Sequence, residues 1–220
     1  IWIISCRYSI NSDKKTRYIV CIEGNKELLE FKSLLKKINT NITVLNVIVN
    51  EDEKTIFVKN IRDERTANVT YKSFIKRIVD VTKCEYVESF ASGSRNSTPF
   101  SRFFRQNMGK GFALTDIDFY MLKNQLFIEE KNYIENNNGF LGVGQCISFK
   151  EVVNDVFIDV EFIIICNYKN NFFISSLNKI NCRNTQNTEN WGKMVCFDLT
   201  PIDIKTLVDC LKDNTCNSMF

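Results

Sequence analysis

The segment 112–131 restricts the fold more than any other part of the sequence. Apolar and polar residues alternate on both sides of a polar turn, which predicts a hairpin of two short strands. Because strand side chains alternate between faces, Asp116 and Asp118 share one face, and so do Glu129 and Lys131. With a two-residue turn, Asp118 lies opposite Glu129 and Asp116 opposite Lys131. The hairpin therefore gathers three carboxylates and an ammonium on one side.

Carboxylates that lie so close together repel one another unless a cation joins them. Hard divalent ions such as Mg²⁺ take carboxylate oxygens and keep several waters for substrate. A lysine beside such a site can hold or activate the attacking water. The hairpin is thus a candidate metal site, although ordinary surface charges on an exposed hairpin fit the same pattern.

The composition narrows the chemistry further. The chain contains no histidine, which excludes a Ser-His-Asp triad, a Cys-His protease and a histidine-based zinc site. The net charge of +3 gives no global basic field, so any surface for nucleic acid is local. No Walker loop or dinucleotide fingerprint occurs, which predicts no nucleotide cofactor. Carboxylates, lysine and oxygen-bound metals remain as the available chemistry.

The cysteines predict the compartment. There are nine, an odd number, and most stand in apolar runs (Cys21, Cys146, Cys166 and Cys196), where a free cysteine behaves as a small buried hydrophobe. No Cys-x-x-Cys pair occurs. No apolar run approaches the length of a membrane span. The sequence therefore predicts an intracellular protein of the reducing cytoplasm, without a membrane partner.

The first part of the chain predicts a small α+β unit over residues 1–66. One strand pair is expected at 1–10 and 17–23, followed by a helix at 26–37. A second strand pair is expected at 42–49 and 55–60. The charged segment 62–65 is the linker candidate. This unit is interpreted either as a structural or dimerising module or as a DNA-docking module that contributes Lys14, Lys15 and Arg17.

The order of the predicted elements beyond the linker is a second indication of the fold, besides the hairpin. Periodicity predicts a helix at 71–82, a strand at 84–91, the hairpin, a helix at about 143–153 and a strand at 160–167. The succession is helix, three strands, helix, strand.

Together, motif and element order resemble the PD-(D/E)XK nuclease superfamily. Asp116, Glu129 and Lys131 stand at its three signature positions, with spacing most like that of archaeal Holliday-junction resolvases. The proline that precedes the first aspartate in the family is replaced by Thr115. The resemblance implies an α/β (α+β) fold, with a restriction endonuclease-like core of a mixed central sheet flanked by helices. The nuclease-like domain is expected over residues 67–220.

The resemblance also implies roles for individual residues. Mg²⁺ (or Mn²⁺) would be bound by Asp116 and Glu129, with Asp118 and the backbone carbonyl of Glu130 as further ligands. Lys131 would orient the attacking water or meet the developing charge. Many relatives place a glutamine that points back at the site in the helix after the Glu-x-Lys strand, and Gln145 holds this position. Simple strand pairing favours Asp118 as the partner of Glu129, whereas the family spacing favours Asp116. A bulge or a longer turn in the hairpin would reconcile the two.

The segment 92–111 is the predicted DNA-contacting loop. It contains no acidic residue, and phenylalanines and hydroxyls alternate with its basic residues, which suits phosphate contacts and stacking on bases. The alternative is a loop whose phenylalanines pack on the core. The predicted contact residues are Ser92, Ser94, Arg95, Arg102, Arg105 and Lys110. Ser92 and Ser94 also belong to a small-residue turn that resolvase-like proteins carry near the scissile phosphate.

The last part of the chain predicts edge strands at 172–176 and 194–199 around an Asn-rich loop at 178–190. A helix is expected from 200 to 211, with Thr200 as cap and Pro201 in the first turn. The Asn-rich loop is either a connection or a second binding loop.

The expected function is metal-dependent hydrolysis of DNA phosphodiester bonds, with junctions or branched DNA as the expected substrate. Two alternatives stay open, a sequence-specific restriction-type endonuclease and a nucleic-acid-binding or assembly protein that kept the fold without catalysis. Cutting two strands symmetrically needs two sites, which makes a homodimer a candidate assembly. The sequence does not distinguish DNA from RNA.

Overall fold

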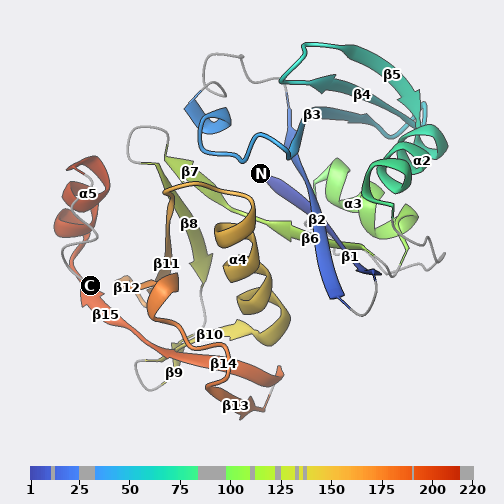
Figure 1. Ribbon diagram of the computed structural model, residues 1–220. Helices are drawn as coiled ribbons and strands as arrows, with labels where there is room; N and C mark the ends of the chain where they lie inside the picture. The colour runs from blue at the N-terminus through green and yellow to red at the C-terminus, as the bar shows by residue number, and fades with distance from the viewer. Residues whose placement is uncertain are drawn as a thin grey trace. The chain divides into compact units, whose positions relative to one another are not determined.

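The computed structural model describes residues 1–10, 13–24, 33–83, 98–109, 112–121, 125–131, 134–135, 138–189 and 191–213. The chain forms two compact units, residues 1–35 with 40–116, and residues 36–39 with 117–220. Both units mix strands and helices, which confirms the predicted α/β (α+β) class (Figure 1). The predicted strand at 84–91 lies outside the described residues, as does most of the predicted helix at 26–37.

A six-stranded sheet forms the first unit, in the order β5-β4-β3-β2-β1-β6. Its strands are β1 (Trp2–Ile10), β2 (Asp13–Glu23), β3 (Thr43–Asn50), β4 (Thr55–Asn60), β5 (Thr66–Thr70) and β6 (Phe112–Asp116). The predicted antiparallel pairs β1 with β2 and β3 with β4 are confirmed, whereas β2 and β3 run parallel. The pairing of β1 with β6 joins the start of the described chain to the predicted hairpin segment.

Helices α2 (Tyr71–Thr82) and α3 (Pro99–Asn107) contribute buried side chains to one core with this sheet. The prediction of α2 is confirmed. The interpretation of 92–111 as a loop is wrong for the residues of α3. Thr98 caps this helix by accepting a 3.3 Å hydrogen bond from the Ser101 N–H, and Pro99 occupies the first turn. The helix buries Phe100, Phe103 and Phe104.

A five-stranded sheet is the centre of the second unit, in the order β15-β12-β11-β8-β7. Its strands are β7 (Phe119–Met121), β8 (Leu126–Lys131), β11 (Glu161–Tyr168), β12 (Asn171–Ser176) and β15 (Thr200–Ile202). Strands β8 and β11 run parallel, and helix α4 (Val143–Asp155) lies between them in the sequence. The predictions of α4 and β11 are confirmed.

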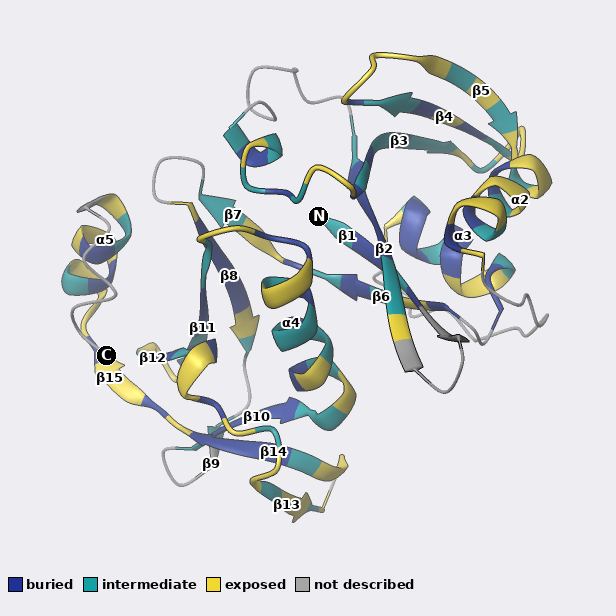
Figure 2. Cartoon of the chain, viewed as in Figure 1, coloured by how far each residue is buried: buried dark blue, intermediate teal, exposed yellow. Residues whose placement is uncertain are grey.

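The two faces of the five-stranded sheet pack on different helices. Phe149 of α4 packs against Phe162 at the start of β11, with tilted rings whose centroids are 4.7 Å apart. On the opposite face, Leu207 and Cys210 of α5 (Ile204–Asp213) join Leu126, Ile128 and other apolar residues in a second core. The burial pattern in Figure 2 follows this arrangement, with buried and exposed residues alternating along both helices.

A smaller four-stranded sheet completes the second unit, in the order β13-β14-β10-β9. It consists of β9 (Ile134–Glu135), β10 (Asn138–Gly142), β13 (Thr185–Thr188) and β14 (Gly192–Asp198), and the short 3₁₀ helix η1 (Leu177–Lys179) precedes β13. Gly139 of β10 faces Phe197 of β14, and a Cβ atom at Gly139 would lie 2.5 Å from the Phe197 ring. Only glycine fits there without displacing the ring.

The C-terminal helix begins later than predicted. Thr200 and Pro201 belong to the edge strand β15 rather than to a helical first turn. The cap of α5 is Asp203, whose Oδ1 accepts a 2.9 Å hydrogen bond from the Thr206 N–H. The helix itself is confirmed, and the predicted cap is wrong.

The boundary between the units follows Asp116. Strands β6 and β7 come from one alternating stretch of sequence, yet β6 pairs with β1 and β7 pairs with β8. The boundary predicted at residue 66 falls inside the first unit, because β5 pairs with β4 and α2 packs on the same sheet.

Candidate active site

Strand β8 presents Glu129 and Lys131 on the face of the sheet that packs against α4. Residues two apart in a strand share a face, so Glu130 between them points to the other side. In the parallel pairing with β11, Glu129 is opposite Ile164 and Lys131 is opposite Cys166. The alternation predicted for this strand is thereby confirmed.

One carboxylate oxygen connects the three predicted catalytic residues of this unit. Gln145 Nε2 donates a 2.9 Å hydrogen bond to Glu129 Oε1, and Lys131 Nζ donates to the same oxygen in an ion pair. The Glu129 side chain is 2% exposed and that of Lys131 is 25% exposed. The structure therefore contains a buried carboxylate beside an ammonium that reaches solvent.

The position of Gln145 follows from the helical repeat of α4. Gln145, Phe149 and Val152 are spaced at i, i+4 and i+7, so they lie on one stripe of the helix. Phe149 and Val152 are buried against the unit's core. Gln145, which is half-buried, extends this stripe at the first turn, where its amide contacts Glu129.

Asp118 lies next to this cluster through the strand register. Asp118 directly precedes Phe119, which pairs with Ile128, the residue before Glu129. The predicted pairing of Asp118 with Glu129 itself stays a prediction. The Glu130 backbone N–H donates a 2.9 Å hydrogen bond to Asp118 Oδ2. The exposed Asp118 carboxylate is thus fixed at the edge of the candidate site.

Asp116 belongs to the first unit. It is the last residue of β6, where it pairs with Trp2 of β1. Two peptide units connect it to Asp118, so the two Cα atoms are within about 7 Å of each other. The chain itself keeps Asp116 close to Asp118.

The donor chemistry of these residues is of the kind that a hard divalent ion takes. Carboxylates of Asp118 and Glu129 and the carbonyl of Glu130 are oxygen donors of the type that Mg²⁺ prefers. Among the residues the structure describes, however, no group of three or more acidic or cysteine side chains is arranged to hold a metal ion. The predicted set of Asp116, Asp118, Glu129 and Glu130 therefore stays a prediction.

Cys166, the cross-strand neighbour of Lys131, does not supply a thiolate to the site. Burial raises the pKa of its thiol to about 12, although the Lys131 charge opposes this shift. The thiol is therefore protonated at neutral pH, and the side chain packs as a small apolar group.

The predicted DNA-contacting residues divide into two groups. Ser92, Ser94, Arg95 and Lys110 lie outside the described residues. Arg102 and Arg105 lie on α3, in the first unit. Arg102 binds Glu51 through hydrogen bonds of 3.0 and 2.6 Å, which lower the pKa of the Glu51 carboxyl. Its contact with DNA stays a prediction. The predicted stacking of bases on the phenylalanines of this segment is wrong, because Phe100, Phe103 and Phe104 are at most 5% exposed.

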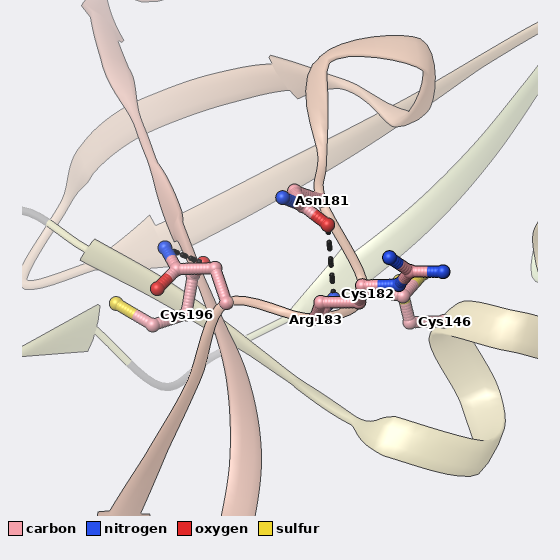
Figure 3. The surroundings of a disulfide bond; sticks show 6 residues. Cys146, Asn181, Cys182, Arg183 and Cys196 are labelled. Carbon is pink, nitrogen blue, oxygen red and sulfur yellow. Dashed lines mark hydrogen bonds between the residues drawn. A yellow bond between two sulfur atoms is a disulfide. The ribbon is translucent and has the colours of Figure 1, made fainter.

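Sequence reasoning missed a disulfide beside the site. Cys146, directly after Gln145, is bonded to Cys182 between Asn181 and Arg183 (Figure 3). The prediction that Cys146 is a free buried thiol is wrong. Disulfides persist in oxidising environments, so this bond does not support the predicted reducing compartment. Cys21 and Cys166 are free thiols and buried, as predicted, and Cys196 is buried as well.

No helix in the described parts of the chain is both long enough and apolar enough to cross a membrane. Comparison of the chain with protein-family models, with curated proteins and with solved structures finds no match.

Proposed function

We propose that this protein is a metal-dependent endonuclease that hydrolyses DNA phosphodiester bonds, with a restriction endonuclease-like core of the PD-(D/E)XK type. The observation that carries the proposal is the shared oxygen of Glu129, which accepts hydrogen bonds from both Lys131 and Gln145. The sequence motif required Glu129 and Lys131 on one face, but it did not require a glutamine from a distant helix to contact them.

The order of elements supports the same proposal. An antiparallel strand pair, β7 and β8, is followed by α4 and by β11, which is parallel to β8. Parallel neighbours need a crossover, and α4 provides it on the face that carries Glu129. The resemblance implied this succession of elements around the Glu-x-Lys strand.

The residues divide the proposed chemistry among them. Mg²⁺ held by Glu129, Asp118, Asp116 and the Glu130 carbonyl would lower the pKa of a bound water and neutralise charge on the phosphate. Lys131 reaches solvent at one end of the cluster, so its ammonium can hold the attacking water or the phosphate oxygen. Gln145 fixes the orientation of the Glu129 carboxylate. Asp118, held by the Glu130 N–H, lines the strand edge where the substrate enters.

One observation favours a second candidate function, a nucleic-acid-binding protein without hydrolytic activity. Lys131 forms an ion pair with Glu129, and the described residues contain no group of three acidic or cysteine side chains that could hold a metal ion. In a protein of this kind the Glu129–Lys131 pair would be purely structural.

A cleavage assay with matched variants tests the proposal. Purified protein is incubated with Mg²⁺ or Mn²⁺ and with linear duplex, single-stranded, flapped, four-way and supercoiled DNA. We expect cleavage by the wild type and a loss of about 10²–10⁴-fold in Lys131→Met and Glu129→Gln.

The controls are Lys205→Met and Asp209→Asn, which remove one charge each from exposed positions of α5 on the other face of the sheet. Both should cut like the wild type. A wild type that binds DNA but cleaves none of these substrates would establish the second candidate instead.

A further inference from the structure

A polar cavity of about 680 Å³ lies in the second unit, apart from the Glu129 cluster. Its walls come from β12, η1, the Asn-rich turn and the end of β14. The lining side chains that the argument uses are Ser175, Lys179, Asn181, Arg183, Asn184 and Asp198. Part of the Asn-rich segment therefore lines a cavity. The sequence left open whether this segment is a connection or a second binding loop.

Strand register places this cavity beside the candidate active site. Glu129 pairs with Ile164 of β11, and Ile164 pairs with Ser175 of β12. These residues form one row across the sheet, so Ser175 lies on the same face as Glu129. Two inter-strand spacings separate their backbones, which is about 10 Å.

The disulfide is a second, independent connection between the two places. Cys182 lies between Asn181 and Arg183, which both line the cavity, and its partner Cys146 directly follows Gln145 (Figure 3). The helix that orients Glu129 is therefore covalently joined to the wall of the cavity.

The turn that carries the cavity's arginine is fixed by amide side chains. Asn181 Oδ1 accepts a 3.0 Å hydrogen bond from the Arg183 N–H (Figure 3). Asn184 Nδ2 donates a 3.0 Å hydrogen bond to the Cys196 carbonyl, and the Cys196 N–H donates to the Asn184 carbonyl at 2.8 Å. These contacts hold the backbone of the turn, while the Arg183 side chain is exposed in the cavity wall.

The charges of the lining favour an anion. Lys179 and Arg183 carry two positive charges against the single carboxylate of Asp198. A guanidinium binds phosphate oxygens in a bidentate manner, and a lysine adds a point charge. Hydroxyl and amide groups, such as those of Ser175 and Asn181, also contact phosphates and sugars in nucleic-acid complexes.

We infer that this cavity binds a backbone phosphate of the substrate nucleic acid, on the same strand as the scissile phosphate. The inference rests on the proposed function. A separation of about 10 Å is short enough for the cavity and the Glu129 cluster to face nearby phosphates of one strand, whose charges follow one another at about 3.4 Å of duplex axis. The cavity would hold the strand in register while Glu129 and Lys131 face the bond to be cut.

Binding without catalysis tests this inference. Fluorescence anisotropy of labelled duplex DNA is measured in EDTA, over a range of salt concentrations, for the wild type, Lys179→Ala, Arg183→Ala and the double variant. Loss of each cation should weaken binding about tenfold, equally on unrelated sequences. The slope of log K against log[salt] should fall by about 0.9 for each lost phosphate contact.

The matched control is Lys205→Ala, an exposed lysine of the same unit on the opposite face of the sheet. Thermal unfolding of each variant checks that the fold is retained. The inference would be overturned if the cavity variants had the same DNA affinity and the same salt slope as Lys205→Ala. That result would leave the nuclease proposal intact.

The two proposals fail in different ways. If the wild type binds DNA through Lys179 and Arg183 but cuts nothing with Mg²⁺ or Mn²⁺, phosphate binding by the cavity stands, whereas the nuclease proposal and the placement beside a scissile phosphate fail. If the wild type neither binds nor cuts DNA, both are overturned.

Discussion

Gln145 and Glu129 are joined by a 2.9 Å hydrogen bond between the first turn of α4 and the buried face of β8. The glutamine amide and the Lys131 ammonium meet at one carboxylate oxygen, so the orientation of Glu129 depends on both. This contact distinguishes the Glu129 cluster from an ordinary pair of strand charges.

Replacing Gln145 by leucine should lower the cleavage rate about tenfold and leave DNA affinity nearly unchanged, because the amide orients Glu129 without touching substrate. Loss of the hydrogen bond should also reduce the free energy of unfolding by about 1–2 kcal/mol. Single-turnover cleavage and urea denaturation measure the two effects. An unchanged cleavage rate in Gln145→Leu would contradict the proposed role of Gln145 in orienting Glu129.

Lys131→Met should destabilise the fold by about 2–3 kcal/mol, because it removes the cation from a carboxylate that is only 2% exposed. The double variant Glu129→Gln with Lys131→Met should recover most of this loss, since no buried charge is left. Denaturant unfolding of the four proteins forms a double-mutant cycle. Additive effects would contradict a direct coupling of the two side chains.

Phe103→Ala should destabilise the protein by about 3–5 kcal/mol through a cavity in the first unit's core. Its ring lies 4.6 Å from that of Tyr71 and 5.6 Å from that of Phe74, centroid to centroid. Arg105→Ala, on the exposed side of the same helix, is the stability control. If Phe103 stacked on bases instead, its removal would weaken DNA binding and leave the melting temperature unchanged.

Cys182→Ser should lower stability by about 2–4 kcal/mol, because the disulfide closes a loop over a sequence separation of 36 residues. Cys146→Ser with Cys182→Ser should lose no more than the single variant. Peptide mapping under non-reducing conditions should recover the Cys146–Cys182 pair. Recovery of both residues as alkylated free thiols from native protein would contradict the bond.

The start of α5 should depend on acid pH through Asp203. Hydrogen bonds from Thr206 hold the pKa of its carboxyl below the usual value of about 3.9. The charged Asp203 cap therefore contributes fully to helix stability at pH values above the usual pKa. This contribution to stability is lost as the pH falls through the lowered pKa of the folded state. Amide exchange in α5 should accelerate across this window in the wild type and not in Asp203→Asn, which keeps an acceptor but has no charge.

Much of the fold followed from periodicity, since the strand pairs β1 with β2 and β3 with β4 and the helices α2 and α4 are read from local patterns. The face shared by Glu129 and Lys131 was predicted for the same reason. Helix α3 was missed although Phe100, Phe103 and Phe104 have helical spacing, because the arginines between them were read as a binding loop. For α5, Pro201 fits both a helical first turn and an edge strand, and tertiary pairing with β12 decides between them.

The remaining differences between the predicted and the observed structure concern contacts between residues far apart in the sequence, which local sequence patterns do not indicate. Cys146 and Cys182 are distant in sequence, and the pairing of cysteines cannot be deduced from their spacing. The boundary after Asp116 divides one alternating segment between two sheets, which its own residues do not signal. The cavity around Arg183 depends in the same way on two separate segments, 175–184 and 196–200, which line it together.

The pairing of β1 with β6 affects the order in which the chain can fold during synthesis. Residues 2–10 acquire β2 as a neighbour early, but their second neighbour, residues 112–116, is made only after the intervening segments. At about 5–20 residues per second, translation of that interval takes on the order of 5–20 s. Throughout this time one side of β1 has open backbone groups on the nascent chain. Until residues 112–116 are made, that edge can pair with other strands, as unprotected sheet edges do.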